Sequence, residues 1–555
     1  MSIGRKGAAL LSGAVALVGF VAVAPWPEQG RAIVAADHPL ASQAGADLLA
    51  QGGNAVDAAV AAALSAGVVQ PAGSGLGGGG FAIGRILEDT FALDFRETAP
   101  RGIDPSAYQN ADGAVVPERS KVGGLAVAVP GEPIGLATLV RRWGRMSLAE
   151  VARPAIRQAA RGAPVGAHLS RSLGRTSFET ITERFTVGER LARTGDVVKR
   201  PDLARTLRRW AKTDGRMLNE GAGAEAVVAT VSGDGNPMTV AELADYVPKD
   251  RTPLVGRYRE YTIITMPPPS SGGIALLQML GALEDVDLTS LGHNSSAYVH
   301  RVTEAMKHAF ADRANFLGDP DFVDVPTERL LSEERIAEII GGFDAERTFE
   351  TGFYGDPIAA PRDGGTQHIS AIDDQGGAVA LTTTINLGFG SGLIPERTGV
   401  ILNNEMDDFA LAPGVPNAFG LVGSEANAVE PGKRPLSSMT PTLVVDGDGD
   451  VVLAVGASGG STIISATLQV LLAVVDFDMN PQEAVAAPRF HHQWLPEQLW
   501  LEPGFARDVI EALKTKGHEV IVRRGFSAAQ AIRVTDVGLE GGADPRKGGW
   551  PAGVY

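Results

Sequence analysis

The residue of this sequence with the clearest chemical potential is Thr366, which follows two glycines and opens a segment with a strand pattern. A threonine hydroxyl becomes a nucleophile only beside a base, and the α-amine of an N-terminal threonine is such a base. That amine titrates at about 7.7–8.0, so a useful share is neutral at working pH. Thr366 could use it only after cleavage of the bond to Gly365. On these residues alone, an ordinary strand-edge threonine behind a glycine loop is the favoured interpretation.

The sequence after Thr366 predicts a β-hairpin centred near Gln375, because extended patterns flank a run of turn-forming residues. In this register Thr366 lies opposite Thr384. Side chains of a strand alternate between its two faces, so Thr382, Thr384 and Asn386 share a face with Thr366.

An arginine and a group of acids have the chemistry to hold a charged ligand. Arg96 follows a predicted strand, and its guanidinium either pairs with an internal acid or grips a ligand carboxylate; the residues alone favour the internal pair. Two of the three acids Glu405, Asp407 and Asp408 could hold a ligand ammonium at a partly buried site. A calcium loop is the competing interpretation, but the ligand spacing of an EF-hand is missing.

Two further segments supply hydroxyl and backbone N–H groups. Ser437 and Ser438 precede a predicted strand at 440–445. A glycine turn at 456–460 precedes a predicted helix at 463–475, and successive N–H groups at such a turn can bind an oxyanion. An ordinary helix N-terminus explains the same pattern.

Two other motifs do not indicate a cofactor or a metal ion. The glycine run at 74–81 follows a predicted helix at 55–68 and lacks both a phosphate-loop and a dinucleotide fingerprint, so close backbone packing is the better interpretation. His491 and His492 face opposite ways in a strand-like segment and make a poor metal pair. The sequence thus predicts no cofactor and no catalytic metal.

Composition limits the class of protein. The chain has 555 residues, 44% hydrophobic and 21% charged, which is a globular composition with length for a large core. A formal net charge of −16 argues against nucleic acid and anionic membranes as partners. The absence of cysteine excludes disulfides, thiolate nucleophiles and cysteine-bound metals.

The first 24 residues have the pattern of an export signal. Arg5 and Lys6 precede an uncharged apolar run that ends in Ala22-Val23-Ala24, a small-x-small cleavage site. We expect cleavage there and a periplasmic or secreted protein, with an uncleaved membrane anchor as the alternative.

These segments, in this order, resemble the γ-glutamyltransferase (γ-glutamyltranspeptidase) family. The matching motifs span nearly the whole mature chain and lie at residues 37–42, 74–81, 95–97, 266–273, 318–322, 366–370, 403–409, 433–439 and 487–492. The resemblance implies an α+β fold, the four-layer αββα sandwich of N-terminal nucleophile hydrolases. It also implies a precursor that cuts itself between Gly365 and Thr366. The chain would then comprise a signal peptide at 1–24, a large subunit at 25–365 and a small catalytic subunit at 366–555.

The same resemblance assigns roles to the candidate residues. Thr366 is the nucleophile, Thr384 hydrogen-bonds it, and the backbone amides of Gly459 and Gly460 form the oxyanion hole. Two further sets bind the two charged ends of the γ-glutamyl group. The α-carboxylate set is Arg96, Ser437 and Ser438, and the α-amino set is Asn386, Glu405 and Asp408.

The implied reaction starts with attack of Thr366 on the γ-amide of glutathione or a related γ-glutamyl compound. Water, or the amine of an amino acid or peptide, then resolves the γ-glutamyl ester. Two departures from the family pattern lie near the site. Gln367 replaces a small or hydroxyl residue but points away from the catalytic face. Phe419 stands in the lid region where a tyrosine is common, which removes one possible hydrogen bond of about 0.5–1.5 kcal/mol.

Two other functions remain open from the sequence. A cephalosporin or glutaryl-amide acylase of the same fold would use Arg96 for a side-chain carboxylate and need the ammonium site less. A non-catalytic periplasmic binding protein for amino acids or peptides would not be cut. The acids Glu405 and Asp408 favour a substrate with both charges, and intact Thr366 and Thr384 argue against a binding protein.

Overall fold

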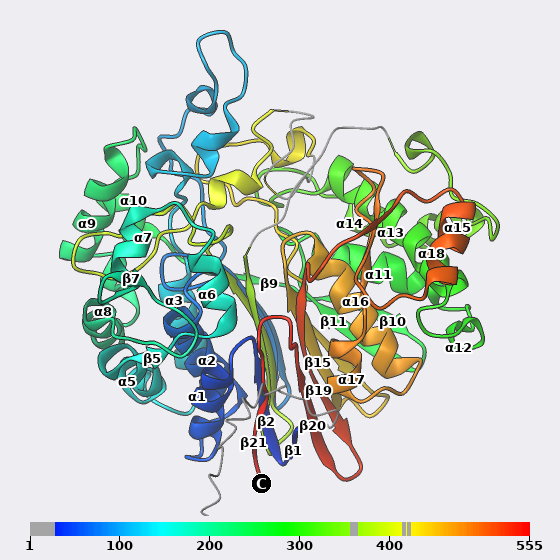
Figure 1. The fold of residues 1–555 in the computed structure, drawn as a ribbon, viewed down its shortest axis with the longest axis horizontal. Coiled ribbons are helices and arrows are strands. Elements are labelled where there is room, and N and C mark those ends of the chain that lie inside the picture. Colours follow the sequence, from blue (N-terminus) through cyan, green and yellow to red (C-terminus); the bar gives the residue numbers. More distant parts are fainter. Residues whose placement is uncertain (1–27, 356–364, 413–417, 419–422) are drawn as a thin grey trace, which may run out of the picture.

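Two seven-stranded antiparallel sheets lie face to face between two layers of helices (Figure 1). The computed structural model describes residues 28–355, 365–412, 418 and 423–555. The first sheet has the order β1 (Glu28–Gly30), β20 (Gly538–Ala543), β19 (Ala528–Thr535), β15 (Val451–Ser458), β14 (Thr442–Val445), β11 (Tyr261–Thr265) and β10 (Leu254–Tyr258). The second has the order β21 (Ala552–Val554), β2 (Ala32–Ala36), β12 (Gln367–Ile372), β13 (Ala378–Thr384), β3 (Gly79–Ile86), β4 (Asp89–Asp94) and β9 (Lys249–Arg251). The predicted α+β class and αββα sandwich are confirmed.

Each sheet is covered by its own helices. The second sheet packs beneath α1 (Pro39–Leu49), α2 (Ala55–Val69), α3 (Glu132–Trp143), α4 (Leu148–Val151), α5 (Arg153–Arg161) and α8 (Pro201–Lys212). The first packs beneath α11 (Gly272–Leu283), α13 (Ser296–Phe316), α16 (Thr462–Val475) and α17 (Pro481–Ala486). One apolar core lies between the second sheet and its helices, and the other extends from the helices of the first sheet through the space between the two sheets.

Further helices and small strands complete the fold. The remaining helices are α6 (Ala167–Leu173), α7 (Glu179–Arg184), α9 (Gly221–Ser232), α10 (Val240–Asp245), α12 (Leu288–Leu291), α14 (Thr327–Leu330), α15 (Glu333–Gly341) and α18 (Arg507–Thr515). The small strands are β5 (Ala163–Pro164), β6 (Thr186–Val187), β7 (Arg190–Leu191), β8 (Val197–Val198), β16 (Phe490–His491), β17 (Leu499–Leu501) and β18 (Val520–Val522).

The hairpin of β12 and β13 has the predicted register. Gln367 pairs with Thr383 and His368 with Thr382, so the residue before β12 lies opposite Thr384. On the predicted shared face, His368 Nδ1 lies 2.8 Å from the Thr382 hydroxyl. Burial lowers the pKa of His368 to about 3, so this imidazole is neutral and links the hairpin strands.

The glycine run at 74–81 packs backbone against backbone, as predicted. A Cβ atom on Gly77 would lie 2.0 Å from the carbonyl oxygen of Ile401, and one on Gly78 would lie 1.8 Å from that of Thr384. Only glycine allows these approaches. The backbone of the glycine run therefore packs directly against the end of β13, which carries Thr384.

Some predictions fall outside the described residues. The export signal at 1–24 and Phe419 lie there, so cleavage of the signal and gating by a lid stay predictions. Among the helices that are described, none combines the length and apolarity that crossing a membrane requires.

Candidate active site

Thr366 stands at the entrance to β12, where the hairpin register brings its hydroxyl to Thr384. The two Oγ1 atoms are 3.3 Å apart, and Thr366 is only 4% exposed. The Thr384 hydroxyl also lies 2.8 Å from the carbonyl oxygen of Gly365, which can only accept. Thr384 has one proton and gives it to Gly365, so Thr366 is the donor between the two hydroxyls.

The backbone around Thr384 is held from both sides. Its oxygen accepts a hydrogen bond of 2.8 Å from the backbone N–H of Asn386, and the N–H of Gly365 donates to the carbonyl of Asn386 at 2.9 Å. Gln367, next in the chain, points the other way and donates to the carbonyl of Gln70 at 2.8 Å. Its predicted position off the catalytic face is confirmed.

Lys547 contacts the backbone of Thr366, and the sequence alone did not point to this lysine. Its Nζ donates to the carbonyl of Thr366, lies 2.7 Å from the Ser458 hydroxyl and forms an ion pair of 3.1 Å with Asp37. Burial raises the pKa of Asp37, and Lys547 partly offsets this. Lys547 is 181 residues from Thr366 in a glycine-rich segment, so no local pattern marks it.

A small pocket opens beside the two threonines. Its lining includes most of the predicted site: Arg96, Thr366, Thr384, Asn386, Glu405, Asp408, Ser437, Ser438 and Gly460. The hairpin, the loop after β4, the short 3₁₀ turn η6 (Glu405–Asp408), the segment before β14 and the turn before α16 supply these residues. The structure therefore gathers residues from five separate parts of the chain around one hydroxyl.

Arg96 is paired with acids of the protein itself, as the sequence around it suggested. Its guanidinium forms ion pairs with Glu405 and Asp408, and Nε donates to the carbonyl of Pro435 at 3.2 Å. Burial lowers the pKa of Arg96, but the surrounding acids more than offset burial and raise it above its usual value. Burial in turn raises the pKa values of Glu405 and Asp408, against the lowering effect of Arg96.

Two buried acceptors in this pocket lack a donor among the described residues. They are Oδ1 of Asn386 and Oε2 of Glu405. Asn386 has a left-handed φ of 70° and anchors its amide by donating to the carbonyl of Asn404 at 2.9 Å. A buried acceptor without a donor costs about 1–3 kcal/mol, so the pair favours a ligand that brings N–H groups.

Arg313 is a second pocket cation that sequence reasoning missed. It comes from α13, is buried, and has Nε 3.0 Å from the Ser271 hydroxyl and Nη2 3.5 Å from that of Ser438. Burial lowers its pKa to about 10, and Asp408 offsets this in part. Several other charged residues lie on α13, so no local sequence pattern singles out Arg313.

The glycine turn after β15 reaches the pocket through Gly460. Both Gly459 and Gly460 have positive φ, 137° and 61°, and a Cβ on Gly459 would lie 2.6 Å from the carbonyl oxygen of Phe526. The predicted helix start is confirmed, since α16 begins at Thr462. The anion-binding role of these two amides stays a prediction.

Comparison with known proteins places this geometry in a family. The sequence model described as Gamma-glutamyltranspeptidase matches residues 41–554. A glutathione hydrolase proenzyme of Escherichia coli (strain K12) is 39% identical over 524 residues, which are 93% of this chain and 90% of that protein.

Solved structures give the same fold. A cephalosporin acylase from Bacillus halodurans has a TM-score of 0.83 at 29% identity and covers 96% of each chain. The γ-glutamyltranspeptidase of Helicobacter pylori has a TM-score of 0.55 at 35% identity, over 58% of this chain and 93% of that one. Since the family model spans nearly the whole sequence and the fold agrees, the chain belongs to the γ-glutamyltranspeptidase family.

Proposed function

We propose that this protein is a self-processing hydrolase and transferase of γ-glutamyl compounds, glutathione among them, with Thr366 as its nucleophile. The observation that carries the proposal is the 3.3 Å contact between the Thr366 and Thr384 hydroxyls at the wall of a pocket with charges of both signs. The names of its relatives, glutathione hydrolase proenzymes, support both the substrate class and the processing.

Processing begins with attack of the Thr366 hydroxyl on the carbonyl carbon of Gly365. The C–N bond breaks, the acyl group moves to the threonine oxygen, and the α-amine of Thr366 takes the proton. Water then hydrolyses the ester and leaves a carboxylate on Gly365. The Thr384 hydroxyl donates to the Gly365 carbonyl, which favours charge development on that oxygen. The products are a large subunit at 25–365 and a small subunit at 366–555.

In the cut enzyme, the freed amine accepts the proton of the Thr366 hydroxyl as it attacks the γ-amide. The amides of Gly459 and Gly460 stabilise the oxyanion, and the amine returns the proton to the leaving group. Water, an amino acid or a peptide then attacks the γ-glutamyl ester. Transfer and hydrolysis differ only in this last nucleophile.

Substrate binding rearranges the ion pairs of the pocket. The α-carboxylate of the γ-glutamyl group binds Arg96 with the hydroxyls of Ser437 and Ser438. The α-ammonium binds Glu405, Asp408 and the amide oxygen of Asn386. The buried acceptors on Asn386 and Glu405 support this placement, because an ammonium supplies the donors that they lack.

A pair of substrates separates this function from its alternatives. γ-Glutamyl anilide and glutaryl anilide differ only in the α-amino group. We expect kcat/KM to be at least about 100-fold higher for the γ-glutamyl compound, since the glutaryl group leaves buried acceptors unpaired. Equal rates, or a preference for glutaryl anilide, would favour the acylase. An uncut chain that binds amino acids without turnover would favour the binding protein.

Arg313 supplies a second prediction, because we assign it to the carboxylate end of the pocket beside Ser438. Arg313→Met should lower kcat/KM for γ-glutamyl anilide by about 10–100-fold, mainly through KM, as expected for loss of a charged hydrogen bond. Arg313→Lys keeps the charge and should recover part of the loss. Unchanged kinetics in a folded Met variant would remove Arg313 from the binding set.

The export signal at 1–24 supports a periplasmic or secreted location, which would place the enzyme where extracellular γ-glutamyl compounds and acceptors meet it. Detection of γ-glutamyl adducts of an amino-acid or peptide acceptor by mass spectrometry would establish transfer beside hydrolysis. Phe419 belongs to the proposed lid, where it lacks the hydroxyl of a tyrosine and thus one possible hydrogen bond.

A further inference from the structure

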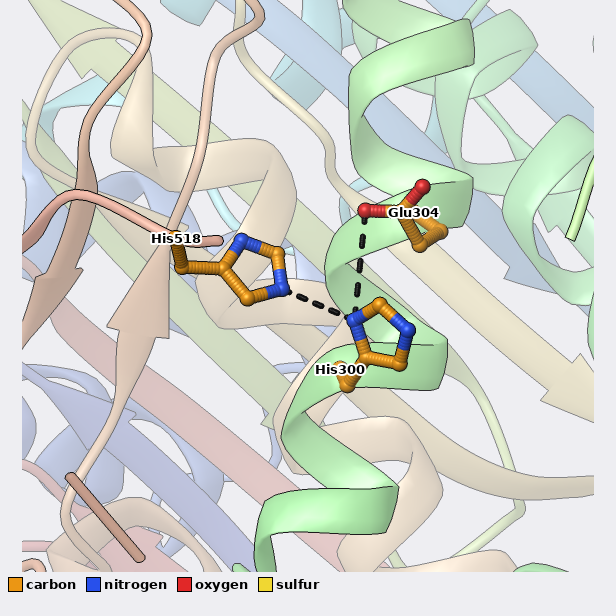
Figure 2. A group of neighbouring side chains, drawn as sticks. All are labelled: His300, Glu304 and His518. Atoms are coloured by element: carbon orange, nitrogen blue, oxygen red, sulfur yellow. Dashed lines mark hydrogen bonds and ion pairs between the residues drawn. The ribbon is translucent and has the colours of Figure 1, made fainter. Parts of the chain in front are cut away.

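Two histidines and a glutamate meet away from the pocket, in the layer of helices that covers the first sheet (Figure 2). His300 and Glu304 are one turn apart on α13, and His518 follows α18. His300 Nδ1 lies 2.8 Å from His518 Nε2 and 4.0 Å from Glu304 Oε1. All three side chains are buried, and their facing atoms lie within 4.8 Å of one another.

The hydrogen bonds around His300 fix which nitrogen is available. Its Nε2 lies 2.8 Å from the carbonyl oxygen of Asp344, which can only accept, so Nε2 carries the proton. Nδ1 of the neutral ring is then a lone pair directed at His518 and Glu304. A backbone carbonyl on the far nitrogen is the usual support of a metal-binding histidine.

Hydrogen bonds from two hydroxyl groups also hold the Glu304 carboxylate in place. The Thr348 hydroxyl donates to Oε1 at 2.7 Å, and the Tyr354 hydroxyl donates to Oε2 at 2.5 Å. Lys307, on the same helix, forms an ion pair of 3.1 Å with Glu497 and donates to Thr348 at 2.6 Å. Among the described residues Glu304 forms no ion pair with a lysine or an arginine, although Arg301 of the same helix interacts with its charge.

We propose that His300, Glu304 and His518 bind a divalent first-row transition metal ion, with Zn²⁺ the ion that fits best. Two imidazoles and one carboxylate are a donor set that zinc accepts, with water as the fourth ligand. Donors about 2.1 Å from a tetrahedral ion lie about 3.4 Å apart. The 2.8 Å gap would open and the 4.0 Å gap would close by about 0.6 Å each.

Besides these movements, binding needs a proton shift within His518. In the hydrogen-bonded arrangement its Nε2–H donates to His300, since His300 Nδ1 has no proton to give. On metal binding, Nε2 becomes a ligand and the proton moves to Nδ1 of the same ring. No oxidation or reduction is involved.

The site would join two parts of the chain. His300 and Glu304 precede the proposed cut at Gly365, and His518 follows it. Other contacts cross at the same place, including Trp494 Nε1 to the carbonyl of Thr351 at 3.0 Å. This part of the inference rests on the proposed function: after self-cleavage, the ion would tie the large subunit to the small one.

The test uses full-length protein purified without a polyhistidine tag and stripped with a chelator. We expect one equivalent of Zn²⁺ per chain, measured by competition with a chromophoric chelator, and Co²⁺ absorption bands of tetrahedral geometry. Glu304→Gln and His518→Gln should each weaken binding by about 100-fold or more, since each removes a ligand. His308→Gln removes a buried imidazole from the same helix and should bind as the unmodified protein does.

Two outcomes would overturn the site. One is less than a tenth of an equivalent bound at micromolar Zn²⁺, which would leave a hydrogen-bonded histidine pair. The other is equal binding by all three variants, which would place the ion elsewhere. If His518→Gln fails to fold, Glu304→Gln, which keeps shape and volume, decides alone.

The tie between subunits has its own readout. In cut protein, Zn²⁺ should raise the urea concentration at which the two fragments separate, and Glu304→Gln should abolish this shift. If the chain is never cut, Zn²⁺ stoichiometry still tests the site, so a failed cleavage and a failed metal site give different results. Zn²⁺ binding without a shift in the urea midpoint would retain the site and reject the tie.

Discussion

Thr366→Ala should yield a single uncut chain without hydrolytic activity, where the unmodified protein gives two fragments, the smaller beginning at Thr366. Alanine keeps the backbone at the start of β12 and removes the only atom that can attack Gly365. Residual turnover of γ-glutamyl anilide should fall by about 10⁴-fold or more, as for loss of other catalytic nucleophiles. Intact mass and N-terminal sequencing measure the first effect, and an anilide assay measures the second.

Thr366→Ser is the matched control. It keeps a hydroxyl in the place that contacts Thr384 at 3.3 Å, so cleavage and part of the activity should survive. A cut Thr366→Ala chain would show that another residue or a protease makes the break. An uncut but active chain would contradict the role of the freed amine.

Arg96→Met should lose both activity and stability, because it removes the cation that Glu405 and Asp408 face. Breaking a buried ion pair by removing one partner costs about 3–5 kcal/mol. The stability loss should grow with pH. Burial already raises the pKa values of both acids against the opposing effect of Arg96, and without it they rise further. The folded state then binds more protons than the unfolded state, so stability falls as pH increases.

Urea unfolding of this variant at pH 5 and pH 8, beside the unmodified protein, checks the prediction. Arg96→Lys should recover most of the stability but little of kcat/KM, since an ammonium keeps the charge and loses the two-pronged grip on a carboxylate. A stability difference that is the same at both pH values would mean that the acids do not depend on Arg96 for their charge.

Local sequence patterns are enough to predict the hairpin and the elements next to it. The turn-forming residues around Gln375 set the register that brings Thr366 to Thr384, and a slip of one residue would exchange the two buried faces of β12. The start of α2 at Ala55 and the close packing of the glycine run that contains Gly78 were likewise predicted from the sequence. These features depend on neighbours in the chain.

What the sequence left open depends on contacts between distant segments. Arg313 reads as one more charged helical residue until α13 packs beside Ser438. Lys547 meets Thr366, and His518 meets His300, only after the sheets and helices assemble. Motif resemblance supplied the roles of Arg96 and Glu405, but their mutual ion pair comes from the fold and sets the electrostatics that a substrate must rearrange.

The strand order of the two sheets sets a sequence of events for the maturing protein. In the second sheet, β12 and β13 lie between β2 and β3, and β21 pairs with β2, so segments from both sides of the proposed cut interleave. Neither fragment carries a complete sheet of its own. Folding would therefore precede the proposed self-cleavage, because each sheet needs strands from both sides of the cut. Exported as one polypeptide, the precursor would reach its destination uncut and would be processed there.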